Sequence, residues 1–134
     1  MSTGPRERQR LAARWLGLAE EHLGLARHAF ALSTAAPHRL IAFHAQQAAE
    51  AALKAHLVKR GIDFPYTHNL AHLLDLTRPW GDDLRAVEEL TPFAVSARYD
   101  LDDEPVTEGE ARRAVAIAGE LLDRVKADCP PDEV

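Results

Sequence analysis

The stretch RLIAFHAQQAAEAALKAHL (residues 39–57) decides the fold class of this chain. Between Leu40 and Leu53 it holds one formal charge, Glu50, and apart from three polar residues the others there are Ala, Leu, Ile and Phe. A helix that is apolar on nearly all sides belongs inside a protein, so this segment predicts a buried central helix. The uncharged polar residues His44, Gln46 and Gln47 then need partners, because burying a polar group without a hydrogen bond is costly.

Composition predicts one helical domain. The chain has 134 residues, which is enough for a single core and too few for two. It contains 24 Ala residues and few β-branched ones, a combination that favours helix. The net charge of −5 argues against a protein that coats nucleic acid without sequence preference. Cys129 is the lone cysteine, which fits a reducing cytosol, and the N-terminal segment has no apolar signal-peptide core. No apolar run is long enough to span a membrane. We therefore expect a cytoplasmic protein.

Apolar periodicity and turn residues outline the helices, and no strand pattern occurs. The sequence therefore predicts an all-α, up-and-down four-helix bundle with an additional short helix. We expect a single domain over residues 1–128 and a disordered tail over 129–134. The first helix is expected to begin near Pro5, to carry Trp15 and Leu32 on its apolar face, and to break between residues 33 and 37. The other helices are expected at 37–60 and at 68–77, a short helix with His68 and His72 on one face. After a turn at 78–81, a fourth helix is expected from 82 onward, with a kink or division at Pro92. The last helix is expected at 107–128, where Thr107 and Glu110 form a capping box.

One stripe of the central helix combines Phe43, Gln47, Glu50 and Lys54 at helical spacing. Glu50 and Lys54 are an i,i+4 pair in the favourable order. The pair is either a helix-stabilising ion pair on a partly exposed edge or a functional carboxylate and ammonium that orient a hydroxyl and a phosphate. For Gln46 and Gln47, a dimer interface or a ligand would provide partners.

Histidines raise two further candidate sites. His44 is expected to be hydrogen-bonded in the core or at a subunit interface. Arg39 and His44 carry the groups that metal-free RNA cleavage needs, but on a helix their side chains diverge by about 140°, so the match is interpreted as chance. His68 and His72, with Asp75 one turn later, have a metal-compatible spacing, yet a third ligand is lacking. We therefore predict capping and surface roles and no metal site.

Three segments resemble the HEPN domain (higher eukaryotes and prokaryotes nucleotide-binding): FHAQQAAEAALKAHLVKRG, THNLAHLL and ARYD. The resemblance extends from about Leu11 to Val125. It implies a helical bundle that usually dimerises and is often encoded beside a minimal nucleotidyltransferase, sometimes as a toxin–antitoxin pair. Toxic members are ribonucleases with an Arg-x4–6-His motif late in the fold.

The position that corresponds to this motif's arginine is Arg98. A histidine would be needed at position 103, 104 or 105, which hold Asp, Glu and Pro. The ribonuclease motif is therefore broken, and RNA cleavage is not expected. Tyr99 lies near the place where a related toxin branch carries a modifiable tyrosine; from the residues alone, Arg98 and Tyr99 fit either packing or phosphate binding.

The family is also similar to the helical domain of aminoglycoside nucleotidyltransferases, in which a glutamate acts as base and a lysine one turn later contacts nucleotide phosphate. The resemblance assigns these roles to Glu50 and Lys54, with Gln47 as a further nucleotide contact. His44 and Gln46 are then interface residues.

The leading hypothesis is a homodimeric accessory subunit that pairs with a nucleotidyltransferase, contributes to nucleotide binding and needs no cofactor. The alternative is a ribonuclease toxin that cleaves RNA with a non-standard site, using Arg98 or Arg39 with His44. A stand-alone nucleotide-binding domain is the third hypothesis.

Overall fold

The described chain folds into helices alone in the computed structural model, which describes residues 4–32, 35–78, 80–94 and 105–128. No strand occurs within those ranges, and this finding confirms the predicted all-α fold class. The elements in chain order are α1 (Pro5–Ala29), α2 (His38–Lys59), α3 (Leu70–Asp75), the 3-10 helix η2 (Trp80–Leu90) and α5 (Glu108–Ala127).

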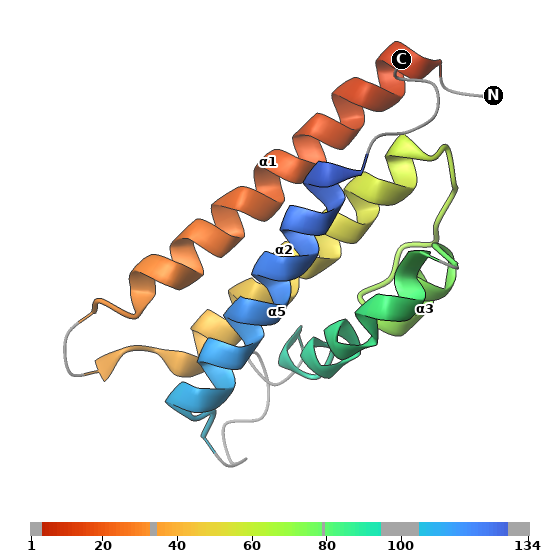
Figure 1. The fold of residues 1–134 in the computed structure, drawn as a ribbon. Helices are drawn as coiled ribbons and strands as arrows, with labels where there is room; N and C mark the ends of the chain where they lie inside the picture. Colours follow the sequence, from red (N-terminus) through yellow and green to blue (C-terminus); the bar gives the residue numbers. More distant parts are fainter. Residues whose placement is uncertain (1–3, 33–34, 79, 95–104, 129–134) are drawn as a thin grey trace.

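The long helices α1, α2 and α5 form the body of the bundle (Figure 1). Figure 1 shows α1 running opposite to α2 and α5, while α3 and η2 return the chain between the ends of α2 and α5. This arrangement is the predicted up-and-down order. The buried helix is α2, as predicted, because nearly every residue from Ile41 to Leu57 is shielded from solvent. Its many Ala side chains allow α1 and α5 to approach closely.

Local signals set the ends of the long helices as predicted. Pro5 occupies the first turn of α1, where its missing N–H is not needed. Gly61 follows α2 with a φ of 69°, a left-handed conformation that glycine adopts without strain. Thr107 and Glu110 form the expected capping box, because the Thr107 hydroxyl accepts from Glu110 N and the Glu110 carboxylate accepts from Thr107 N, both at 3.0 Å.

The short helix expected at residues 68–77 is shorter than predicted. It spans Leu70–Asp75, and His68 precedes it. The Asn69 side chain accepts a hydrogen bond from His72 N and caps the first turn, which fixes the start after His68. The prediction that His68 and His72 share one helical face is therefore wrong.

The fourth helix also differs from its prediction. It begins at Trp80, where a turn was expected, and it is a 3-10 helix with a kink at Leu84. The buried residues Leu84, Val87 and Leu90 are three apart, which suits the three residues per turn of a 3-10 helix. The helix ends at Leu90, Pro92 lies in the turn at residues 91–92, and helical residues resume at 93–94, so the chain is divided at Pro92, as predicted.

Two further boundaries complete the comparison with the predicted outline. Helix α1 ends at Ala29, so Leu32, expected on its apolar face, lies beyond the helix and is 58% exposed. The predicted disordered tail at 129–134 falls outside the described residues. Among the described helices, none has the length and apolar character needed to cross a membrane.

Candidate functional site

Glu50 and Lys54, one turn apart on α2, form a buried ion pair. Lys54 Nζ lies 3.0 Å from Glu50 Oε2, and Glu50 is 7% exposed and Lys54 5% exposed. The interpretation that placed the pair on a partly exposed helix edge is therefore wrong. Buried charges persist when they are paired and hydrogen-bonded, and loss of one partner leaves the other uncompensated. The pair is thus a fixed feature of the interior.

The Glu50 carboxylate receives two more polar contacts from other side chains. His68 Nδ1 lies 2.7 Å from Glu50 Oε1, and Gln46 Nε2 donates to the same oxygen at 3.3 Å. The Gln46 carbonyl in turn accepts from Gln47 Nε2 at 2.6 Å. Glu50 therefore joins α2 to the chain before α3, and its two oxygens are held in a defined orientation.

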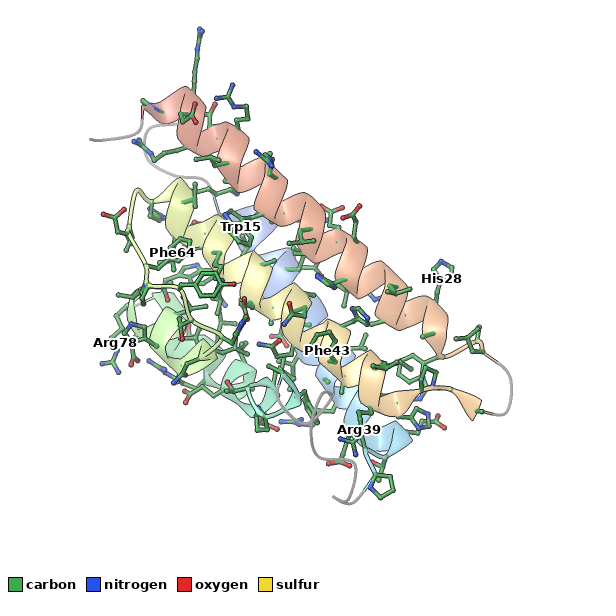
Figure 2. All side chains as sticks on the ribbon, turned by 180° about the vertical axis from the view of Figure 1, so that it is seen from behind. Trp15, His28, Arg39, Phe43, Phe64 and Arg78 are labelled. Carbon is green, nitrogen blue, oxygen red and sulfur yellow. The ribbon has the colours of Figure 1, made fainter. Side chains whose placement is uncertain are left out.

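Three aromatic rings surround the Lys54 ammonium. Its Nζ lies 5.3 Å from the centre of the Trp15 ring, 5.9 Å from that of Phe64 and 5.7 Å from that of Tyr66. These distances are within the range of cation–π attraction. Figure 2 shows Trp15 and Phe64 beside the same stretch of α2. Lys54 is therefore held by the Glu50 carboxylate on one side and by aromatic rings from α1 and the 62–69 loop.

The 62–69 loop brings alternate residues to the ion pair. Phe64 and Tyr66 reach Lys54, and His68 reaches Glu50. An extended chain places every second side chain on one face, which accounts for this spacing. Gly61 turns the chain out of α2, and the Asn69 cap starts α3, so both ends of the loop are fixed by local structure.

A family model for the HEPN domain matches residues 12–128. The chain belongs to the HEPN family. It is also similar to the crystal structure of TT1696 from Thermus thermophilus, with 31% sequence identity and a TM-score of 0.73. That alignment covers 86% of this chain and 95% of the Thermus chain. The comparison with curated proteins gives no match.

In this HEPN chain, His44 faces a second histidine across the seam between α1 and α2. His44 Nδ1 and His22 Nδ1 are 2.9 Å apart, and the ring planes are inclined at 29°. Burial lowers the pKa of both imidazoles, and His44 lowers that of His22 further. Both rings are therefore neutral near pH 7, and at this distance one Nδ1–H donates to the bare Nδ1 of the other ring.

The predicted interface residues have partners within the chain. Gln46 is fully buried and bonded to Gln47 and Glu50, and His44 is half-buried against His22. Phe43 and Gln47, the other members of the predicted stripe, are also half-buried. A subunit interface at His44 and Gln46 stays a prediction.

Two other predicted sites have different outcomes. Arg98 and Tyr99 lie outside the described residues, so their geometry stays untested. His68 contacts Glu50, whereas His72 is exposed on α3. No group of three or more His, Cys, Asp or Glu side chains in the described ranges is arranged to hold a metal ion.

Sequence reasoning did not find the aromatic part of the site. Trp15 was interpreted as part of the apolar stripe of α1, and no role was assigned to Phe64 or Tyr66. The signal that could have found them is their proximity in sequence to the family-like THNL segment. His68 is the second residue of that segment, and its partner is Glu50.

A second polar cluster joins the C-terminal ends of α2 and α5. The buried His56 imidazole stacks on the Trp80 indole, with centres 3.8 Å apart and planes at 12°. Its Nδ1 is 3.2 Å from Asp128 Oδ2, but the two atoms form no hydrogen bond. Arg60 binds Asp128 at 2.7 Å, and Lys59 donates to backbone carbonyls at the end of α5. Burial lowers the pKa of His56 to about 4, so the ring is neutral near pH 7.

Proposed function

We propose that this HEPN protein is a cytoplasmic, dimeric accessory subunit that pairs with a separate nucleotidyltransferase and contributes to nucleotide binding. HEPN membership supports a nucleotide-binding or ribonuclease-type function in general. The observation that carries the finer proposal is the fixed pair of Glu50 and Lys54. A carboxylate can accept from a ligand hydroxyl and an ammonium can bind phosphate, so one rigid helix turn provides both contacts.

The ligand would reach this pair through the 62–69 loop. Tyr66 is 94% exposed, and the His68 side chain is 44% exposed, so both residues connect the buried pair with solvent. A base can stack on the Tyr66 ring, as bases do on aromatic side chains elsewhere. Phosphate would then approach Lys54, with Gln47 as a further polar contact. The loop must shift for this approach, because the pair is buried in the structure described above.

The dimer would use the exposed leucines of α1. Leu18 is 40% exposed and Leu25 is 55% exposed, and they lie two turns apart on one helix face. Large apolar side chains that repeat on one exposed face are typical of a protein interface. His22 lies between them in sequence and pairs with His44 of the same chain, so the proposed interface would lie beside this histidine pair. The double variant Leu18→Gln, Leu25→Gln is expected to be a monomer where the wild type is a dimer, as measured by light scattering. Leu40→Gln, which changes an exposed leucine of α2, is the control.

The proposed partner is a nucleotidyltransferase, and the two proteins would form a module similar to a toxin–antitoxin pair. Ribonuclease activity is not part of the proposal, because positions 103–105, where the Arg-x4–6-His motif would need a histidine after Arg98, hold none. RNA cleavage without added metal separates the two hypotheses. Cleavage by the purified protein that Arg98→Ala abolishes would replace the binding role with an unusual ribonuclease.

Nucleotide binding provides the direct test of the proposed site. ATP, GTP, CTP and UTP are titrated by calorimetry into the wild type, Glu50→Gln and the control Glu120→Gln, which changes an exposed glutamate on α5. Saturable binding of at least one nucleotide, weakened on the order of tenfold by Glu50→Gln alone, is the expected result. Equal affinity in the wild type and Glu50→Gln would remove Glu50 from the site. Circular dichroism of each variant shows whether it remains folded.

A further inference from the structure

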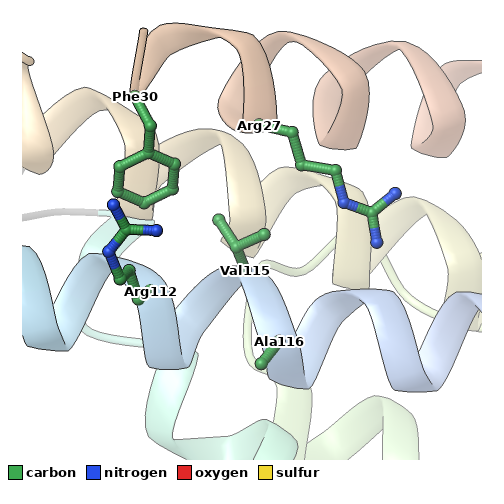
Figure 3. A pocket seen from close by; sticks show the side chains of 5 residues that line it. All are labelled: Arg27, Phe30, Arg112, Val115 and Ala116. Atoms are coloured by element: carbon green, nitrogen blue, oxygen red, sulfur yellow. The ribbon is translucent and has the colours of Figure 1, made fainter.

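A pocket of about 410 Å³ lies between the C-terminal part of α1 and α5. Figure 3 shows the five residues that line it. Phe30, Val115 and Ala116 provide an apolar surface, and the guanidinium groups of Arg27 and Arg112 lie toward its two ends. This combination of apolar lining and cationic ends distinguishes the pocket from the Glu50 site, which holds a carboxylate at its centre.

The two arginines differ in how they are held. Arg112 Nε donates to Glu108 at 2.8 Å, and its guanidinium carbon lies 4.4 Å from the centre of the Phe30 ring. Its charge is therefore partly compensated by a carboxylate and an aromatic face. Arg112 and Phe30 together form one wall of the pocket.

Arg27 has no hydrogen-bond or ion-pair partner among the described residues. Its guanidinium crosses from α1 onto α5 at Gly119, where a Cβ atom would lie 2.7 Å from Nη2. Only glycine leaves room for this placement, since real Cβ contacts are longer. The charge is thus held beside an apolar pocket with no carboxylate opposite it, in a chain whose net charge is −5.

We propose that this pocket binds a small organic anion, with its phosphate or carboxylate on Arg27 and its apolar body against Phe30 and Val115. Guanidinium groups bind both anions through paired N–H donors. The pocket volume falls within the range of small-molecule sites, and an apolar lining with few polar groups is typical of them. This proposal is independent of the nucleotide site at Glu50.

Phenyl phosphate is the probe that tests the proposal, with benzoate and inorganic phosphate as comparison ligands. Chemical shifts of the Val115 methyl groups are followed by NMR. We expect saturable shifts with phenyl phosphate and an affinity loss on the order of tenfold in Arg27→Gln. Gly119→Ala leaves every lining residue unchanged but displaces the guanidinium, so it is expected to weaken binding as well. Arg113→Gln, an exposed arginine of α5 paired with Glu89, is the control and keeps wild-type affinity.

The comparison ligands give each outcome a meaning. Tighter binding of phenyl phosphate than of benzoate assigns a phosphate ester, and the reverse order assigns a carboxylate. Inorganic phosphate that binds as tightly as phenyl phosphate would overturn the proposal, because the apolar lining would then contribute nothing. Unchanged affinity in both Arg27→Gln and Gly119→Ala, or an absence of shifts at Val115, would overturn it too.

Discussion

Acidification is expected to destabilise this protein through His56. The pKa of this residue is about 4 in the folded chain because of burial, whereas its ordinary value is 6.5. Between these pH values the unfolded chain binds more protons, so the free energy of unfolding falls as the pH falls. The full difference corresponds to about 3 kcal/mol, and about 2 kcal/mol of it is lost between about pH 7.5 and pH 5.

Urea unfolding of the wild type and His56→Phe at these two pH values measures this contribution. Phenylalanine keeps an aromatic ring against Trp80 but cannot take up a proton. The wild type is expected to lose about 2 kcal/mol more than the variant on acidification. Some pH dependence remains in both proteins, because the pKa values of His22 and His44 are also lowered. Equal losses in the two proteins would refute a buried, neutral His56.

Three further predictions concern stability and are measured by urea unfolding near pH 7. Lys54→Met leaves the Glu50 carboxylate buried without its ammonium and is expected to cost about 3–5 kcal/mol; a loss below about 1 kcal/mol would contradict a buried pair. Gly61→Ala is expected to cost about 1 kcal/mol because φ is 69°, whereas Gly17→Ala on α1, which meets no neighbour, should not destabilise. Thr107→Ala removes the capping box and is expected to cost about 1 kcal/mol, and an unchanged midpoint would show that the cap adds nothing.

The fold could be predicted where the determining interactions are local. The apolar character of α2, its glycine stop at Gly61 and the Thr107–Glu110 box are each visible within a few residues of sequence. The α3–η2 region was predicted less well, because its boundaries depend on a single Asn69 cap and on packing at three-residue spacing. Helical propensity does not distinguish 3-10 from α-helix in such a short segment.

The candidate site could be predicted only in its local half. Glu50 and Lys54 are one turn apart on one helix, so their pairing follows from spacing alone. Trp15 reaches them from another helix, and Phe64, Tyr66 and His68 reach them from the 62–69 loop. Such contacts depend on how α1 and the loop pack on α2, which no pattern in the sequence encodes directly. The burial of the pair was missed for the same reason.

The most direct test of the proposed nucleotide site is an NMR titration that shows where a nucleotide binds. The nucleotide with the highest affinity is added to isotope-labelled protein, and the Trp15 indole N–H and the backbone amides of residues 64–68 are followed. Binding at the Glu50–Lys54 pair predicts that these signals shift most and that Glu50→Gln removes the shifts. Shifts confined to other parts of the bundle, or none at saturating nucleotide, would contradict the proposed role of the pair.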